Sequence, residues 1–211
     1  LLLRAEVDPF PLSLEEWKQQ YWSWMETPDP EAILKSTIFF DFRPLYGNYD
    51  LVDKLRSWLI PLPATYPLFL RIMADEALTC SPALSWTGGF VYDGGKEHPH
   101  TINLKLHGAR PFVDTARIWS LTHGIWETNT GDRRRSVAEK THQSPKETAA
   151  EIEAFYLVQR FRFQQQLAAD HPEKANRLNP SDLNKLNRLM LKEAFKHAKQ
   201  LQLRLKLQHG L

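Results

Sequence analysis

Two charged residues, Asp41 and Arg43, lie in the strongly apolar string "IFFDFRPLYGN". An unpaired charge in an apolar interior costs several kcal/mol, on the order of 3–5, so each residue needs a partner. If residues 30–43 form a helix, Asp41 shares a face with Leu34 and Ile38 and points toward the core. Arg43 would then lie about 200° away around the helix. If the string is extended, both charges point to the same side. A structural ion pair is favoured over the polar wall of a binding site, because buried carboxylates usually pair or cap.

A second group of charges lies within thirteen positions of the string "INLKLHGARPFVDTAR". Asp114 and Arg117 are three residues apart on an expected helix, so they can pair locally. Lys105 stands between Leu104 and Leu106 on an expected strand. If those leucines face the core, Lys105 faces away from it and is an ordinary solvated lysine.

Three arginines, Arg133 to Arg135, follow a cap-like "TGD". Cations in the first turn of a helix oppose the positive end of its macrodipole. A phosphate or carboxylate bound there would relieve this conflict through free amides and guanidinium groups. Alternatively, the three side chains are solvated or contact acidic groups of the N-terminal half. The sequence leaves these alternatives open.

Other familiar chemical motifs are incomplete. His98 and His100, with Asp93 and Glu97 nearby, have no second cluster to complete a metal site, so no metal is expected. The single cysteine, Cys80, allows no disulfide within the chain, which fits a cytoplasmic protein. Neither GxSxG, the GKS or GKT ending of a P-loop, nor a Gly-Ser followed by paired acids is present. Apolar runs are far too short for a membrane span, so no membrane partner is expected.

Helical signals dominate the elements that must position these residues. "SLEE" and "SPKE" have the form of capping boxes, and Asp29 followed by Pro30 predicts another helix start. Between the helices, "SWTGGFVYDGGKEHPHTINLKLHG" predicts a β-hairpin with strands near 85–92 and 100–106. After "SPKE", a helical stripe predicts a long helix; its members are Ala149, Ile152, Tyr156, Phe163 and Leu167. A last helix is expected to open at "NPSD", residues 179–182.

The expected fold is therefore all-α, or mainly α. It is a helical bundle with two long antiparallel C-terminal helices and one small β-hairpin near 85–106. Residues 1–211 are expected to form a single domain, a C-terminal fragment of a larger protein. Charge is uneven, because residues 1–100 carry 8 basic and 14 acidic side chains and residues 101–211 carry 19 and 11. This imbalance is too dispersed to indicate a nucleic-acid partner.

Two strings and the two final helices together carry a family resemblance. "IFFDFRPLYGNYDLVDKLR" and "NLKLHGARPFVDTARIWSLTHGIWETNTGDRR" resemble the nucleotidyltransferase substrate-binding domain family, long catalogued as a domain of unknown function. The resemblance extends from about Trp17 to the end. Such domains lie at the C-terminus of bacterial proteins similar to signal-transduction uridylyltransferases, in which CBS or cyclic-nucleotide-binding modules often come first. One departure is Asn103, where the family pattern has an aspartate.

The resemblance implies an accessory domain, with catalysis in a nucleotidyltransferase domain in cis. Nucleoside triphosphate and Mg²⁺ are expected only with that catalytic domain, and no cofactor is expected in this chain. The acceptor is expected to be a protein or a small molecule. Six residues match the family pattern and are candidate substrate- or phosphate-binding residues: Asp41, Arg43, Lys105, Asp114, Arg117 and Arg133.

The alternative is a structural or dimerisation domain. It would relay signals from upstream CBS or cyclic-nucleotide-binding modules without binding substrate. A homodimer, or an interface built from Trp17, Trp22 and Trp24, would fit this interpretation.

Overall fold

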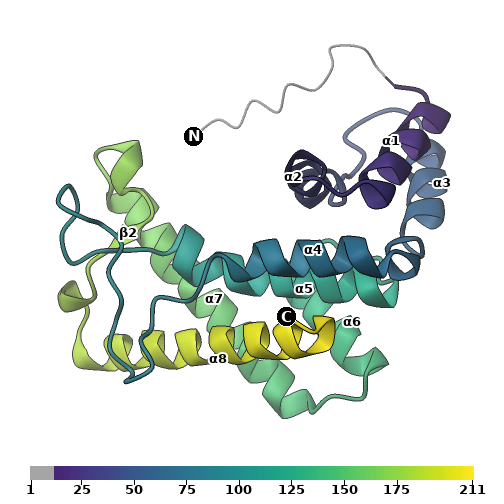
Figure 1. The fold of residues 1–211 in the computed structure, drawn as a ribbon. Helices are drawn as coiled ribbons and strands as arrows, with labels where there is room; N and C mark the ends of the chain where they lie inside the picture. Colours follow the sequence, from purple (N-terminus) through teal and green to yellow (C-terminus); the bar gives the residue numbers. More distant parts are fainter. Residues whose placement is uncertain (1–11) are drawn as a thin grey trace.

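The computed structural model describes residues 12–211, which form eight α-helices and a two-stranded sheet (Figure 1). The helices are α1 (Leu14–Glu26), α2 (Pro30–Phe39), α3 (Tyr49–Leu59), α4 (Pro67–Leu78), α5 (Arg110–His123), α6 (Thr130–Lys140), α7 (Pro145–Ala168) and α8 (Lys185–His209). The strands are β1 (Ile102–Asn103) and β2 (Arg177–Leu178). The mainly helical fold expected from the sequence is confirmed.

Polar caps fix where several helices begin. Ser13 and Glu16 form the expected capping box, with a 2.6 Å bond from the Ser13 amide to the Glu16 carboxylate. Asp29 accepts the Ala32 amide at 2.7 Å and starts α2. Ser144 caps α7 in the same way. The last helix is shorter than expected, because "NPSD" forms a separate 3₁₀ turn and α8 begins at Lys185.

The β-structure is paired differently from the predicted hairpin. Strand β1 pairs antiparallel with β2, so that Ile102 lies opposite Leu178. The strand expected at 85–92 is not formed, and that segment makes only an isolated bridge between Leu84 and Phe90. The alternating pattern predicted a local partner, but the buried Ile102 is instead paired with Leu178 from the connection between α7 and α8.

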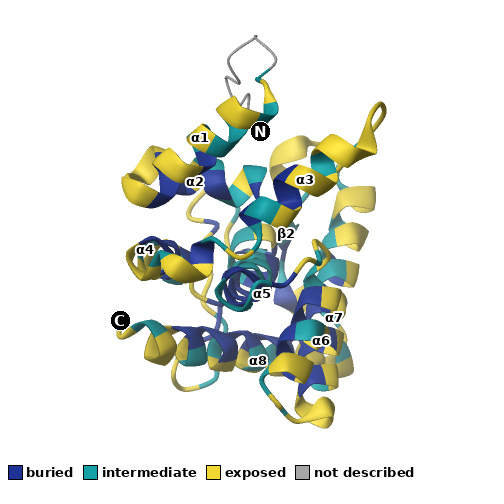
Figure 2. Cartoon of the chain, turned by 90° about the vertical axis from the view of Figure 1, so that its right-hand side faces the viewer, coloured by how far each residue is buried: buried dark blue, intermediate teal, exposed yellow. Residues whose placement is uncertain are grey.

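Helix α5 is the centre of the core (Figure 2). Eight of its fourteen residues are buried, and α4, α6 and α8 all pack against it. Helices α7 and α8 are in contact in an antiparallel sense, because Glu151, early in α7, contacts Arg204, late in α8. The figures show that this pair crosses at an angle.

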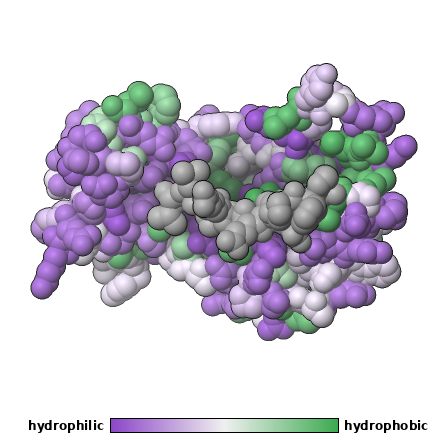
Figure 3. All heavy atoms as spheres, turned by 90° about the horizontal axis from the view of Figure 1, so that it is seen from above, coloured by the Kyte–Doolittle hydropathy of each residue, from purple (hydrophilic) through white to green (hydrophobic). Residues whose placement is uncertain are grey.

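Helices α1 to α3 gather at one end of the molecule around a cluster of aromatic rings (Figure 1). Tyr21 is its centre: its ring lies 5.2 Å from that of Trp24 and 5.3 Å from that of Phe40. The Tyr21 hydroxyl donates to the Phe39 carbonyl at 2.6 Å. Viewed from above, apolar side chains also gather on the surface at this end (Figure 3).

One packing expectation is wrong. Helix α2 ends at Phe39, and its Leu34 and Ile38 are exposed rather than buried. The chain turns after Phe40, so Asp41 does not continue their face. The core side of α2 is formed by Ala32, Ile33 and Ser36 instead.

Candidate functional site

Asp41 is the centre of a charged cluster that joins three parts of the chain. It follows α2 directly, and it faces Arg117 of α5 and Arg133 of α6. Arg117 donates to one Asp41 oxygen through Nη2 at 2.8 Å and Nε at 3.3 Å. Arg133 donates to both Asp41 oxygens. The carboxylate is therefore shared between two guanidinium groups from elements distant in sequence.

The electrostatics of this cluster follow from partial burial. Burial by itself would raise the pKa of the Asp41 carboxyl, but the hydrogen bond from Arg133 and the charges of Arg117 and Arg133 lower the pKa below its ordinary value. The Arg133 side chain is almost fully buried, and its Nε donates to the Glu127 carbonyl at 2.8 Å. All three nitrogens of the Arg133 guanidinium are thus used within the protein.

Asp114 extends the cluster along α5. It accepts from Arg117 Nη1 at 3.2 Å and from Arg110 Nε at 2.9 Å. Arg110 also reaches Glu76 at 3.1 Å and the Cys80 sulfur at 3.0 Å. Burial raises the pKa of Asp114, and the arginine charges offset this only in part. The i, i+3 pair expected between Asp114 and Arg117 is confirmed.

Arg56 is a member of this region that the sequence reasoning missed. This α3 arginine is buried, donates to the Phe42 carbonyl at 3.1 Å, and also donates to the Trp126 carbonyl. Its guanidinium carbon lies 4.6 Å from the Trp126 ring centroid. Its burial could have been predicted from the sequence, because Arg56 lies beside Leu55 and Leu59 on an otherwise apolar helix face.

Arg43 and Lys105 lie apart from the cluster. Both are exposed, and neither side chain makes an ion pair or hydrogen bond with the described residues. Lys105 does not stand on a strand but opens a π-helical turn, Lys105–Ala109. Asn103 caps that turn, because its side-chain oxygen accepts the Lys105 amide at 3.0 Å and the Leu106 amide at 3.2 Å. An aspartate at this position could make the same bonds.

The loop that follows Asp41 projects into solvent. Leu45 is 84% exposed and Tyr46 is 98% exposed. Gly47 has φ of 105°, a conformation that favours glycine and turns the chain back into α3. The start of the loop is held, since Asp41 is in the charged cluster and Arg56 of α3 donates to the Phe42 carbonyl. A fixed base therefore presents an exposed arginine, leucine and tyrosine.

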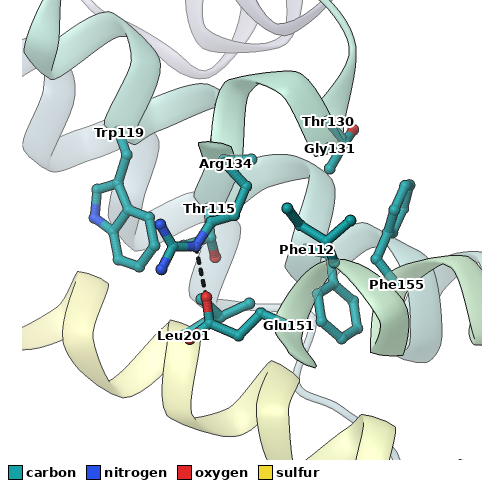
Figure 4. A pocket seen from close by; sticks show the side chains of 11 residues that line it. Phe112, Thr115, Trp119, Thr130, Gly131, Arg134, Glu151, Phe155 and Leu201 are labelled. Carbon is teal, nitrogen blue, oxygen red and sulfur yellow. Dashed lines mark hydrogen bonds and ion pairs between the residues drawn. The ribbon is translucent and has the colours of Figure 1, made fainter. Parts of the chain in front are cut away.

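The three consecutive arginines have three different environments. Arg133 contacts Asp41, as one of the sequence alternatives expected, and Arg135 pairs with Asp132 at the surface. Arg134 is buried and donates to Glu151 of α7 at 2.6 Å (Figure 4). The sequence left contact with acidic groups of the N-terminal half open as one alternative, and it gave no sign of Glu151 as a partner.

Arg134 also lines a small cavity between α5, α6, α7 and α8 (Figure 4). The cavity volume is about 10 Å³, comparable with the space that one water molecule needs. The walls include Trp119, whose ring lies 5.3 Å from the Arg134 guanidinium carbon. Burial is the main cause that lowers the pKa of Arg134. This cavity is too small for a nucleotide and belongs to the structural core.

A larger apolar pocket lies between α1 and α3. Its volume is about 370 Å³. It is lined by Leu12, Leu14, Trp17, Tyr21, Phe39, Phe42, Leu51, Val52 and Leu55. Its described lining is apolar or aromatic and includes no charged side chain.

Residues 12–211 contain neither a metal-binding cluster nor a helix that could cross a membrane. No cluster of three or more His, Cys, Asp and Glu side chains is arranged to hold a metal ion in this part of the chain. None of its helices has the length and apolar character needed to cross a membrane.

Comparison with known proteins gives one match. Residues 67–209 match the family model described as "Putative nucleotidyltransferase substrate binding domain". Neither a curated protein nor a solved structure matches the chain. The matched range begins at α4, so it includes Lys105, Asp114, Arg117 and Arg133 but not Asp41 or the exposed loop.

Proposed function

Because this chain belongs to the family of putative nucleotidyltransferase substrate binding domains, we propose that it is a substrate-binding module serving a nucleotidyltransferase domain in the same polypeptide. The family match over most of the chain is the observation that carries this proposal. The transfer reaction, the nucleoside triphosphate and Mg²⁺ are assigned to the neighbouring domain. The module itself supplies binding and orientation of the acceptor, which is a protein or a small molecule.

Within this function, we assign the charged cluster a supporting role. Arg117 and Arg133 each use all three guanidinium nitrogens on protein acceptors. Asp41 and Asp114 are in turn neutralised by arginines. Little hydrogen-bonding capacity is left for a ligand, so these four residues hold the loop and the helices in place. Their direct contact with substrate is not part of the proposal.

Substrate contact is assigned to the exposed loop above the cluster. The Arg43 guanidinium has no partner among residues 12–211, and a guanidinium suits phosphate or carboxylate groups. Tyr46 offers an almost fully exposed ring, which could stack on a base or another planar group. Lys105 lies in the matched family region but stays a solvated lysine with no assigned role.

Isothermal titration of the chain with candidate acceptors that carry phosphate or carboxylate groups tests the assignment, and UTP and ATP, with and without Mg²⁺, are titrated for comparison. Arg43→Ala is expected to weaken binding by about tenfold or more, since a hydrogen bond to a charged group is worth about 1.5–3 kcal/mol. Arg71→Ala is the matched control, because Arg71 is also exposed but lies on α4. Equal affinities of the two variants would contradict the role of Arg43.

A second candidate function is structural. The mutual pairing of Asp41, Asp114, Arg117 and Arg133 favours a structural role for these residues. In this function the domain would relay signals from upstream CBS or cyclic-nucleotide-binding modules without holding substrate. The two functions differ in what the chain binds. A chain that self-associates in light scattering, yet gives no heat with nucleotides or with acceptors, would favour the structural function.

A further inference from the structure

The outer face of α7 carries an exposed stripe with regular spacing. The stripe consists of Ala149, Glu153, Tyr156, Arg160, Phe163 and Leu167, all of them exposed. Successive members are four and three residues apart, which is the heptad spacing of a helix that packs along another helix. The stripe spans about 27 Å at 1.5 Å per residue. Most of the apolar pattern that predicted this helix therefore faces outward.

The large apolar side chains of the stripe are about half exposed or more. Tyr156 is 47%, Phe163 is 60% and Leu167 is 73% exposed. The side of α7 that packs inward is built from other residues, among them Ile152, Phe155 and Val158. Large exposed apolar side chains that recur along one helix face are typical of a protein contact surface.

A groove between α7 and α8 adjoins the stripe. Its volume is about 570 Å³. The α7 side contributes Tyr156 and Leu157, and the α8 side contributes Leu189 and Met190. Leu189 is itself half exposed. The stripe and groove together offer a track that a second helix could occupy.

The charged residues on this face can pair with the same residues of a second copy. Glu153 and Arg160 both line the groove, and neither forms an ion pair with another described residue. They lie seven residues apart, two helical turns, at either side of Tyr156. If two copies of α7 pack antiparallel about a two-fold axis near Tyr156, Glu153 of each copy lies opposite Arg160 of the other. A parallel arrangement would place like charges together.

The sizes of the facing side chains also fit the antiparallel register that pairs Glu153 with Arg160. Pairing Glu153 with Arg160 sets Phe163 opposite Ala150, so a large ring meets a small side chain on both sides of the axis. An isologous contact repeats every such pair twice. Glu193, which also lines the groove, is already paired with Lys196 in its own chain.

We propose that the stripe and groove of α7 and α8 are the contact surface of a homodimer, in which α7 of a second copy runs antiparallel to the first. The spacing, exposure and charge of this face support the dimer. It is independent of the substrate-binding function proposed above, since the loop at Arg43 takes no part in it.

Sedimentation equilibrium of the chain over a wide concentration range tests the dimer, and charge reversal tests its register. Glu153→Arg places arginine opposite arginine and is expected to raise the dimer dissociation constant by about tenfold or more. Arg160→Glu should do the same with two glutamates. An equimolar mixture of these two variants is expected to associate again, because each chain then presents the charge that the other lacks.

Glu26→Arg, the same charge change on an exposed site of α1, is the matched control and should leave association unchanged. Phe163→Ser should weaken the dimer, whereas Leu203→Ser, at an equally exposed α8 position, should not. Circular dichroism confirms that each variant is folded. A wild-type chain that stays monomeric, or a mixture that fails to associate, overturns the proposal. Dimers that persist in both single charge variants place the contact on another face and also overturn it.

Discussion

At the scale of single residues, Asp41 is the clearest case of a charge explained by its partners. Its carboxylate is shared by Arg117 and Arg133, and both arginine side chains are more buried than Asp41 itself. Removing the Asp41 carboxylate therefore leaves two nearly buried guanidinium groups without the negative charge that they share. The stability of the protein should depend more on this one carboxylate than on an exposed one.

Asp41→Ala is expected to lower the free energy of unfolding by roughly 3 kcal/mol, the low end for breaking a buried pair because Asp41 keeps some contact with solvent. Urea denaturation measures the change. Asp75→Ala is the control, since Asp75 is an exposed acid on α4, and it should alter stability by less than about 0.5 kcal/mol. Equal stability of the two variants would show that the cluster does not brace the fold.

The lowered pKa of Asp41 also fixes the sign of a pH effect. A folded-state pKa below the unfolded value means that the charged carboxylate stabilises the fold above about pH 4, and that this stability is lost as pH falls through the folded pKa. The raised pKa of Asp114 acts in the opposite direction: its contribution is present at low pH and is lost as pH rises through the folded pKa. The two effects partly cancel in the wild type.

Comparing wild type with Asp41→Asn isolates the first effect. The stability difference between them is expected to shrink as pH falls below about 4, the ordinary pKa of an aspartate, because the wild-type carboxylate is then protonated. Urea denaturation at a series of pH values measures it. A difference that stays constant across this range would rule out titration of Asp41 as its source.

At the scale of elements, the turn Lys105–Ala109 shows how closely the pieces around α5 approach. Gly108 is buried in this turn, and an added Cβ would lie 2.8 Å from a Val158 methyl group of α7. Leu104 and Phe195 are the next neighbours, at 3.5 and 3.6 Å. The turn can sit against α7 and α8 only because this position lacks a side chain.

Gly108→Ala is therefore expected to destabilise the fold by about 1–3 kcal/mol, the usual cost of overpacking a core. Thermal unfolding followed by circular dichroism measures the loss. Gly89→Ala serves as the comparison, because its Cβ would meet only the Ser85 hydroxyl at 3.4 Å. If Gly108→Ala is no less stable than Gly89→Ala, the approach of the turn to α7 is looser than described.

At the scale of the whole molecule, helices α1 to α3 are joined to the rest by apolar contacts, such as that of Phe40 with Phe69 of α4, and by a few long polar side chains. Asp41 reaches α5 and α6, and Arg56 reaches the carbonyl of Trp126 in the loop between them. Within the three helices, rings packed on Tyr21 supply most of the contact. We therefore expect this end to open more readily, as a unit, when its polar attachments are removed.

Arg56→Met should increase amide hydrogen exchange throughout α1, α2 and α3 while leaving α5 and α8 protected. The substitution keeps much of the side-chain volume but removes the bonds to Phe42 and Trp126. Lys54→Met, at an exposed position of the same helix, should leave exchange unchanged. Faster exchange in all helices alike would mean that Arg56 stabilises the fold globally rather than holding this one end.

Several features could be predicted from the sequence because they depend on near neighbours. The cap at Ser13, the start of α2 at Asp29, the pair of Asp114 with Arg117 and the long helix from Pro145 all involve residues within one or two turns. Family membership is also carried by the sequence alone. Local geometry is enough in each case, since backbone periodicity fixes which residues meet.

Only the tertiary structure decided which charges meet and which apolar faces stay open. Asp41 lies 76 and 92 positions from its arginine partners, and Glu151 takes an arginine that sequence spacing could equally have left in solvent. The same limit explains why β1 pairs with residues 177–178 rather than with a local strand. A periodic pattern predicts a face but not what covers it: much of the stripe that predicts α7 faces solvent, because other residues of that helix fill the core.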